Sequence, residues 1–126
     1  MPATPSQSIT QPQAATVLSK SVARAAERLG VSRAQLARVL GVSAATITRL
    51  YSGAYLLEHN RKEWEFALLF VRLFRSLDSI VGNEASARTW LNSENHSLNG
   101  RPLELISNTE GLVRVVQYLD ASRARV

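Results

Sequence analysis

The chain of 126 residues contains no cysteine, and this absence limits the kinds of site that it can hold. Without thiols there is no disulfide framework, no thiolate metal site and no cysteine nucleophile, which suits a reducing compartment. The two histidines, His59 and His96, lie in separate predicted loops, and no carboxylate pair or phosphate-binding Gly-rich loop accompanies them. We therefore expect no enzyme, no metal, no cofactor and no small-molecule substrate.

Long hydrophobic runs are also missing. Residues 1–15 are rich in Pro, Ser, Thr and Gln and have neither the basic region nor the apolar run of a signal peptide. Such a segment cannot bury enough surface to offset the entropy of ordering it, so we expect a disordered tail followed by a helix from Thr16. The most apolar stretch, residues 60–81, is interrupted by charges and is too short for a membrane span. The sequence therefore predicts a cytoplasmic protein that does not contact membranes.

The positive charge is concentrated in one half of the chain. Residues 20–62 carry eight basic and two acidic side chains, whereas residues 63–126 carry seven basic and eight acidic ones. A local excess of this kind favours a polyanionic partner for the first half only. The second half is expected to have a different partner.

Residues 60–82 predict a long helix with apolar residues on two opposite faces. Helical spacing separates Trp64, Ala67, Leu68, Val71 and Phe74 from a second set made of Phe66, Leu69, Phe70, Leu73, Leu77 and Ile80. Asn60 and Glu63 have the spacing of a capping box, and Gly82 is suited to end the helix. Because both faces must be covered, the helix is expected to lie between two groups of helices or between two subunits.

Residues 32–53 contain the most specific pattern in the chain. Ser32 and Ser43 are suited to cap two short helices, and Gly41 is suited to the left-handed turn between them. The segment Leu36 to Leu50 reads L-A-x-x-L-G-V-S-x-x-T-I-x-R-L. It resembles the helix-turn-helix of the Xre/Cro repressor family.

In such motifs the second helix enters the major groove of DNA and its N-terminal residues approach the base edges. The resemblance thus implies operator DNA as a partner, with contacts to bases or phosphates from Ser32, Arg33, Gln35, Ser43, Ala44, Ala45, Thr46, Thr48 and Arg49. Arg49 is suited to a bidentate contact with guanine. A helix-turn-helix kept only as a scaffold stays open, because Ser43 caps its helix whatever it binds and two alanines are a poor reading surface.

The region after Gly82 predicts three more helices. Asn83 is suited to cap a helix that ends near Asn92, and Pro102 begins a short helix to Ile106. Asn108 or Thr109 caps the last helix, whose apolar stripe consists of Leu112, Val115, Val116 and Leu119. The basic tail after Asp120 is expected to fray.

The same region carries a second resemblance. The segments W-L-N, L-N-G-R-P-L-E-L-I and T-E-G, followed by Tyr118-Leu119, resemble the toxin-binding domain of the Xre/MbcA/ParS antitoxins, as does E-x-A-L-L-x-V-R-L-x-R-S-L-D upstream. Contacts with a toxin are accordingly expected from Trp90, Leu98, Gly100, Arg101, Pro102, Thr109, Gly111, Tyr118, Arg123 and Arg125.

Together the two resemblances imply an all-α bacterial type II antitoxin. Its expected parts are a tail at 1–15, a helix-turn-helix domain at 16–59, a linking helix at 60–82 and a toxin-binding domain at 83–126. The implied partner is a toxin of the RES-domain kind, which consumes NAD or transfers ADP-ribose, and the complex commonly represses its own operon. Because DNA-binding motifs of this kind usually act as symmetric pairs on two half-sites, a homodimer is expected. A stand-alone repressor whose C-terminal part dimerises or senses an effector is the alternative.

Overall fold

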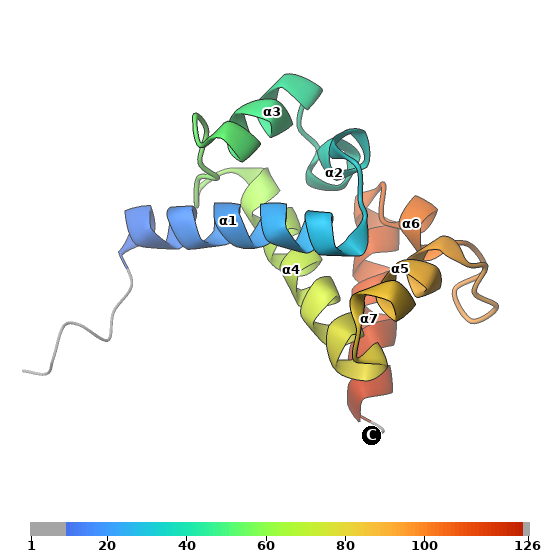
Figure 1. Cartoon of the computed structure of the whole chain (residues 1–126). Helices are drawn as coiled ribbons and strands as arrows, with labels where there is room; N and C mark the ends of the chain where they lie inside the picture. Colours follow the sequence, from blue (N-terminus) through green and yellow to red (C-terminus); the bar gives the residue numbers. More distant parts are fainter. Residues whose placement is uncertain (1–9, 125–126) are drawn as a thin grey trace, which may run out of the picture.

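The computed structural model describes residues 10–124, which form seven helices and no strand. Their bounds are α1 Gln11–Leu29, α2 Arg33–Leu40, α3 Ala44–Ser52, α4 Lys62–Val81, α5 Glu84–Asn92, α6 Pro102–Leu105 and α7 Thr109–Ala124. In Figure 1, α1 crosses α4, α2 and α3 lie above α1, and α5, α6 and α7 lie to the right of α4. The prediction of an all-α fold is confirmed.

The first helix begins earlier than the sequence indicated. It starts at Gln11 instead of Thr16, because Thr10 and Gln13 form a capping box and Pro12 stands in the first turn. Residues 10–15 are therefore not part of a disordered tail, and residues 1–9 lie outside the described part of the chain. The helix ends where Gly30 adopts the left-handed conformation, at φ 69°.

The predicted helix-turn-helix forms with the predicted caps. The Ser32 hydroxyl accepts from the main-chain N–H of Gln35, and the Ser43 hydroxyl accepts from that of Thr46. Gly41 has φ 71°, a conformation that costs residues with a Cβ free energy, so a glycine is favoured at this turn. The inward-facing residues Leu36, Ala37, Leu40, Ile47 and Leu50 are buried, whereas Val42 is half-buried.

Helix α4 is the shared element of the fold, but its start differs from the prediction. It begins at Lys62, and Asn60 makes no capping hydrogen bond because Arg61 occupies the N-cap position. One side of α4 packs on α1 and α2 and another packs on α7. Leu68 and Ile80 remain exposed, since these helices do not cover the whole circumference of α4.

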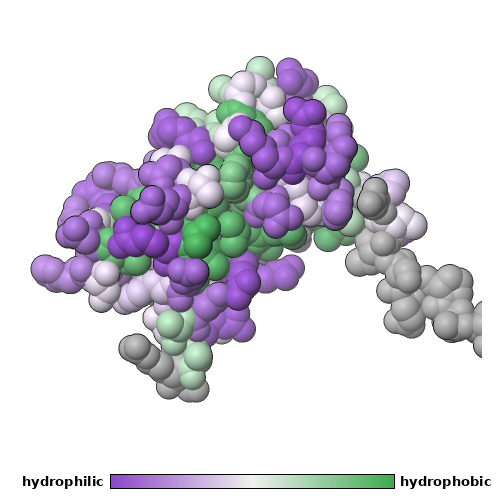
Figure 2. Space-filling view, turned by 180° about the vertical axis from the view of Figure 1, so that it is seen from behind, coloured by the Kyte–Doolittle hydropathy of each residue, from purple (hydrophilic) through white to green (hydrophobic). Residues whose placement is uncertain are grey.

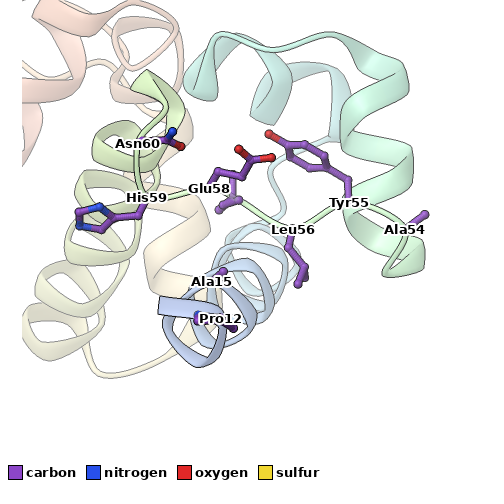
Figure 3. A pocket seen from close by; sticks show the side chains of 9 residues that line it. Pro12, Ala15, Ala54, Tyr55, Leu56, Glu58, His59 and Asn60 are labelled. Carbon is purple, nitrogen blue, oxygen red and sulfur yellow. The ribbon is translucent and has the colours of Figure 1, made fainter. Parts of the chain in front are cut away.

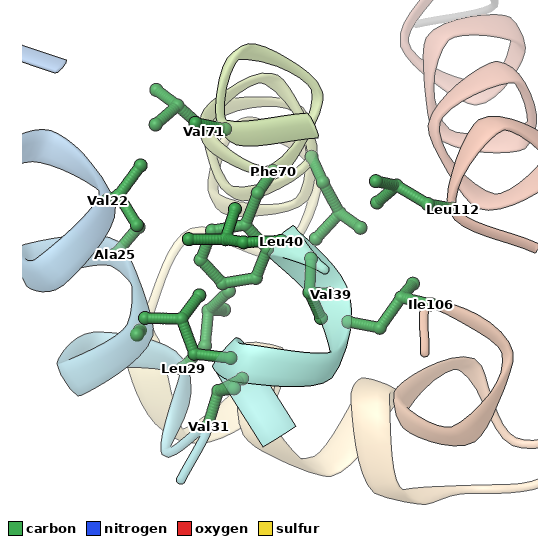
Figure 4. Close-up of a cluster of buried hydrophobic side chains, with 14 of the residues drawn as sticks. Val22, Ala25, Leu29, Val31, Val39, Leu40, Phe70, Val71, Ile106 and Leu112 are labelled. Atoms are coloured by element: carbon green, nitrogen blue, oxygen red, sulfur yellow. The ribbon is translucent and has the colours of Figure 1, made fainter. Parts of the chain in front are cut away.

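A single apolar core joins all these helices. Figure 4 shows Phe70 of α4 surrounded by side chains of α1 and α2, with Ile106 and Leu112 approaching from the C-terminal part. The buried residues run without interruption from Leu18 in α1 to Leu119 in α7. The segments 16–59 and 83–126 therefore share one core through α4.

The C-terminal helices are capped largely as expected. The Asn83 side chain accepts from the main-chain N–H of Ser86, and Pro102 stands at the start of α6. Asn108, not Thr109, caps α7, because its Oδ1 accepts from the N–H of Gly111 at 2.8 Å. The stripe of Leu112, Val115, Val116 and Leu119 is buried.

No helix within residues 10–124 combines the length and hydrophobicity that crossing a membrane requires.

Candidate functional site

The N-terminal half of α3 presents a small polar surface. Ala44, Ala45, Thr48 and Arg49 are exposed on it. The Thr48 hydroxyl donates a hydrogen bond within the helix, to the carbonyl of Ala44 at 3.2 Å. The surface therefore offers a partner the methyl groups of the two alanines, the guanidinium of Arg49 and the Thr48 hydroxyl as an acceptor.

Arg49 is held near the start of α3 by its neighbours. Its Nη2 donates to the Thr46 hydroxyl at 3.3 Å, and that hydroxyl shares a 3.0 Å hydrogen bond with the Ser43 hydroxyl. Ser43 and Thr46 thus orient Arg49 in addition to capping the helix. A pre-positioned guanidinium loses less side-chain entropy on binding than a freely rotating one.

The start of α2 contacts the C-terminal half of α3. Ser32 and Gln35 bond to each other's main-chain N–H groups, so the Oε1 atom of Gln35 is occupied and its amide NH2 is left for a partner. Arg33 lies over the ring of Tyr51, at 4.3 Å from the ring centroid. Burial raises the pKa of Tyr51, the charge of Glu27 adds to this rise and Arg33 opposes it. Arg33 therefore helps to anchor the C-terminal half of α3.

Two further basic residues flank the same surface, and motif reasoning missed them. A pocket next to the start of α3 is lined by Ser43, Thr46, Arg49, Arg61 and Lys62, among others. Arg61 and Lys62 are exposed and stand at the first turn of α4. The signal for them was the charge count of residues 20–62, which does not show where in space each charge lies. Three cations beside the N-terminal end of α3 form a surface suited to phosphates.

A buried carboxylate fixes the loop between α3 and α4. Glu63 is only 4% exposed. Its Oε2 accepts from the Tyr55 hydroxyl at 2.8 Å and from Arg61 Nε at 3.1 Å. Burial by itself raises the pKa of a carboxyl group, but hydrogen bonds from Tyr55, its own main-chain N–H and Arg61 outweigh burial and bring the pKa of Glu63 below its ordinary value. Burial and the bond to Glu63 raise the pKa of Tyr55 to about 12.

The same loop packs against α1. Figure 3 shows residues 54–60 bordering a pocket whose other wall contains Pro12 and Ala15 of α1. The N–H of Leu57 donates to the buried Ser19 hydroxyl at 2.9 Å. His59 lies edge-on to the Trp64 ring, with 5.2 Å between ring centroids. These contacts give His59 a packing partner, and within residues 10–124 no group of acidic or histidine side chains is arranged to hold a metal ion.

An aromatic pair marks the surface of the C-terminal helices. The rings of Trp90 in α5 and Tyr118 in α7 are stacked, with centroids 6.3 Å apart and planes inclined by 19°. Both side chains are half-buried, and Trp90 also lines a shallow groove with Val81, Ala85 and Thr89. The fold thus brings together two predicted toxin contacts that are 28 positions apart in the sequence.

Three other predicted toxin contacts are buried in this structure. Leu98, Pro102 and Gly111 face the interior, because the loop before α6 folds over α7. Arg114 secures this loop by donating to the Leu98 carbonyl at 2.7 Å. A Cβ on Gly111 would collide with the main-chain carbonyl of Leu105. These residues shape the module and do not present side chains to a partner.

The remaining predicted contacts are at or near the surface. Thr109 is exposed, Gly100 is half-buried, and Arg101 forms an exposed ion pair with Glu104 at 3.2 Å. Arg123 is in the last turn of α7 instead of a frayed tail, and its Nη1 donates to the Ser76 hydroxyl of α4 at 3.2 Å. Arg125 lies outside the described residues.

Comparisons with known proteins assign both halves of the chain. Residues 8–72 match the antitoxin Xre-like helix-turn-helix domain, and residues 76–125 match the antitoxin Xre/MbcA/ParS C-terminal toxin-binding domain. No curated protein matches the chain. Among solved structures, the fold is similar to a chain in the crystal structure of the M. tuberculosis MbcT-MbcA toxin-antitoxin complex, with a TM-score of 0.65 and 23% identity over 87% of this chain and 96% of that one.

Proposed function

Because the chain belongs to the Xre-like helix-turn-helix antitoxins, we propose that it neutralises a RES-domain toxin through residues 83–126 and represses its own operon through α3. One observation carries this proposal: the chain joins a DNA-reading motif and a toxin-binding domain on a single helix, α4. As an antitoxin it acts by binding and not by catalysis. The cytoplasm is the proposed site of action, since operator and toxin meet there.

The DNA-binding part is supported by charge and geometry. Arg49, Arg61 and Lys62 surround the N-terminal end of α3, where main-chain N–H groups also favour anions. In repressors of this type two motifs bind two half-sites, so we propose that the chain acts as a homodimer. Base contacts would come from Arg49 and the alanine methyl groups, and phosphate contacts from Arg33, Gln35, Arg61 and Lys62.

Fluorescence anisotropy with the chain's own promoter DNA tests this part. Arg49→Ala is expected to weaken binding by about 1–3 kcal/mol if Arg49 reads a base, whereas Lys62→Ala is expected to reduce the salt dependence of binding. Arg101→Ala, which removes an exposed arginine from the C-terminal module, is the matched control. If Arg49→Ala and Arg101→Ala change the affinity for promoter DNA equally, Arg49 of α3 does not read a base.

The toxin-binding part is tested by co-expression with the product of the adjacent gene. We expect a stable complex, seen in a native mass measurement, and rescue of cells from a toxin that depletes NAD or transfers ADP-ribose. Deletion of residues 83–126 is a poor test, because it exposes Leu73 and Leu77 of the shared core. Full-length chains with surface substitutions at Trp90 or Arg101 avoid this problem.

The alternative, a stand-alone repressor, makes a different prediction. Such a chain would bind its operator but neither form a complex with an adjacent gene product nor rescue cells. The match of residues 76–125 to a toxin-binding domain favours the antitoxin.

A further inference from the structure

A groove of about 550 Å³ lies between α1 and α4, and neither DNA reading nor the predicted toxin contacts use its apolar walls. Val17 and Leu18 of α1 line it on one side, and Leu68 and Val71 of α4 line it on the other. Val17 is 56% exposed and Leu68 is 43% exposed. They make up half of the large apolar side chains that are exposed within residues 10–124. Figure 2 shows hydrophobic surface across the middle of the face opposite that of Figure 1, bordered by hydrophilic side chains.

Leu68 is part of a charged stripe on the solvent side of α4. Glu65, Leu68, Arg72 and Arg75 are all exposed and follow one another at steps of three and four residues. The stripe is acidic toward the start of the helix and basic toward its end. A second copy of α4 in antiparallel orientation therefore presents the opposite order of charges.

The ion pairs inside the chain leave both ends of this stripe available. Glu65 and Arg75 form no ion pair within residues 10–124. Arg72, between them, is held toward α7 by Asp120, with 2.6 Å between Nη2 and Oδ2. The guanidinium of Arg72 is thus occupied, whereas its aliphatic stem adds apolar surface to the groove that Leu68 also lines.

We propose that this stripe and the groove beside it form the interface between two copies of the chain, with the two α4 helices antiparallel about a twofold axis. The axis passes α4 near Phe70, because Glu65 and Arg75 are equally distant from that level. Glu65 of each copy faces Arg75 of the other, and Leu68 of each copy covers the stem of Arg72 of the other. The isologous contact buries Leu68 twice and pairs four charges that have no ion-pair partner among residues 10–124 of their own chain.

Arginines that border the groove favour this occupant. Arg72 is already paired with Asp120, so Arg75 and Arg123 make the rim basic, which attracts a partner helix with a carboxylate and repels a basic one. Glu65 supplies that carboxylate from the second copy. The inference deepens the proposed homodimer by giving it a surface, and it rests on that proposal.

Sedimentation equilibrium of the full chain at a series of concentrations tests the apolar contact. The unmodified chain is expected to dimerise, and Leu68→Gln is expected to raise the dissociation constant of the dimer by at least about tenfold. Leu56→Gln, which changes a side chain of similar exposure (41%) in another pocket, is the matched control. Circular dichroism and thermal melting verify that both variants keep the fold.

Charge reversal tests the pairing itself. Glu65→Arg and Arg75→Glu are each expected to weaken the dimer, and the double variant is expected to restore it, because the reversed charges again face each other. A dimer that none of these variants weakens overturns the interface and leaves the homodimer intact. A chain that is monomeric at all concentrations overturns both. If these variants dimerise with normal strength but no longer bind the toxin, the groove is a toxin contact and the proposed dimer interface is overturned as well.

Discussion

Arg88 of α5 donates a hydrogen bond from Nε to the main-chain carbonyl of Arg28 at 2.8 Å, although 60 residues separate them in the sequence. Its Nη2 donates to the neighbouring carbonyl of Glu27 at 3.0 Å. The Glu27 carbonyl also accepts from the Gly30 N–H at 3.2 Å, and the positive charge of Arg88 at this helix end complements the helix dipole. The pair therefore connects the end of α1, in the helix-turn-helix half, to the C-terminal half.

We predict that Arg88→Ala lowers the free energy of unfolding by about 1 kcal/mol, because two exposed hydrogen bonds are lost and water replaces them. Urea denaturation measures the change. Arg88→Lys keeps the charge but not the two-pronged geometry, so it is expected to recover only part of the loss. Arg101→Ala, which removes an exposed arginine paired only with Glu104, is the control. An effect of Arg88→Ala no larger than that of Arg101→Ala would contradict the connecting role.

A second prediction concerns the dependence of stability on pH. The pKa of Glu63 is lower in the folded chain than its ordinary value, so its ionised form contributes stability that is present above pH 4.5 and is lost as pH falls through the folded pKa. The pKa of Tyr55 is raised to about 12, so its contribution is complete below pH 10 and is lost as pH rises toward 12.

Glu63→Gln is therefore expected to reduce the steepness of acid unfolding, and Tyr55→Phe that of alkaline unfolding. At pH 7, Tyr55→Phe is expected to cost about 1–3 kcal/mol, because a buried carboxylate loses a hydrogen-bond donor. Thermal melting as a function of pH gives both results. Glu104→Gln, at an exposed carboxylate, is the control and is expected to leave the loss of stability at acid pH unchanged.

Local signals explain which elements were predictable from the sequence. Ser32, Gly41 and Ser43 act on main-chain groups within a few residues, so their pattern identified both helices of the motif. Asn60 shows the limit of such reasoning, because its spacing to Glu63 fits a capping box. The carboxylate is instead drawn into the interior by Tyr55, so α4 starts without that cap.

Contacts between distant segments were not predictable in the same way. Nothing in the residues around Arg88 indicates that it reaches the end of α1, and Ser19 gives no local sign that it accepts from Leu57. The C-terminal motif identified the toxin-binding domain, but not which of its residues face outward. Leu98 and Gly111 belong to the motif because they pack, whereas Trp90 and Tyr118 are at the surface.

Gly111 gives a prediction about packing. A Cβ at this position would collide with the carbonyl of Leu105, a main-chain group that cannot rotate away. Gly111→Ala is therefore expected to cost about 1–3 kcal/mol, as is typical of overpacked sites, although alanine is the better helix former. Denaturant titration checks this value. Val113→Ala, at a half-buried position of the same helix, is the comparison, and a stabilising effect of Gly111→Ala would contradict the predicted collision.

The last prediction concerns the stacked pair of Trp90 and Tyr118, whose rings lie 6.3 Å apart on the surface of the C-terminal module. Half-buried aromatic side chains are frequent centres of binding energy, because they offer large rigid surfaces at a low entropic cost. Trp90→Leu keeps an apolar side chain against Tyr118 and removes the indole. It is expected to weaken toxin binding by about 2 kcal/mol, and circular dichroism verifies that the variant keeps the fold.

Calorimetric titration of the purified toxin with each variant measures this change. Arg49→Ala, on the DNA-reading surface, is the control and is expected to bind toxin like the unmodified chain. If a correctly folded Trp90→Leu chain binds the toxin as tightly as the unmodified chain does, the aromatic pair is not part of the toxin contact. Exposed Arg101 and Thr109 would then be the predicted contacts to test next, since Leu98, Pro102 and Gly111 are buried.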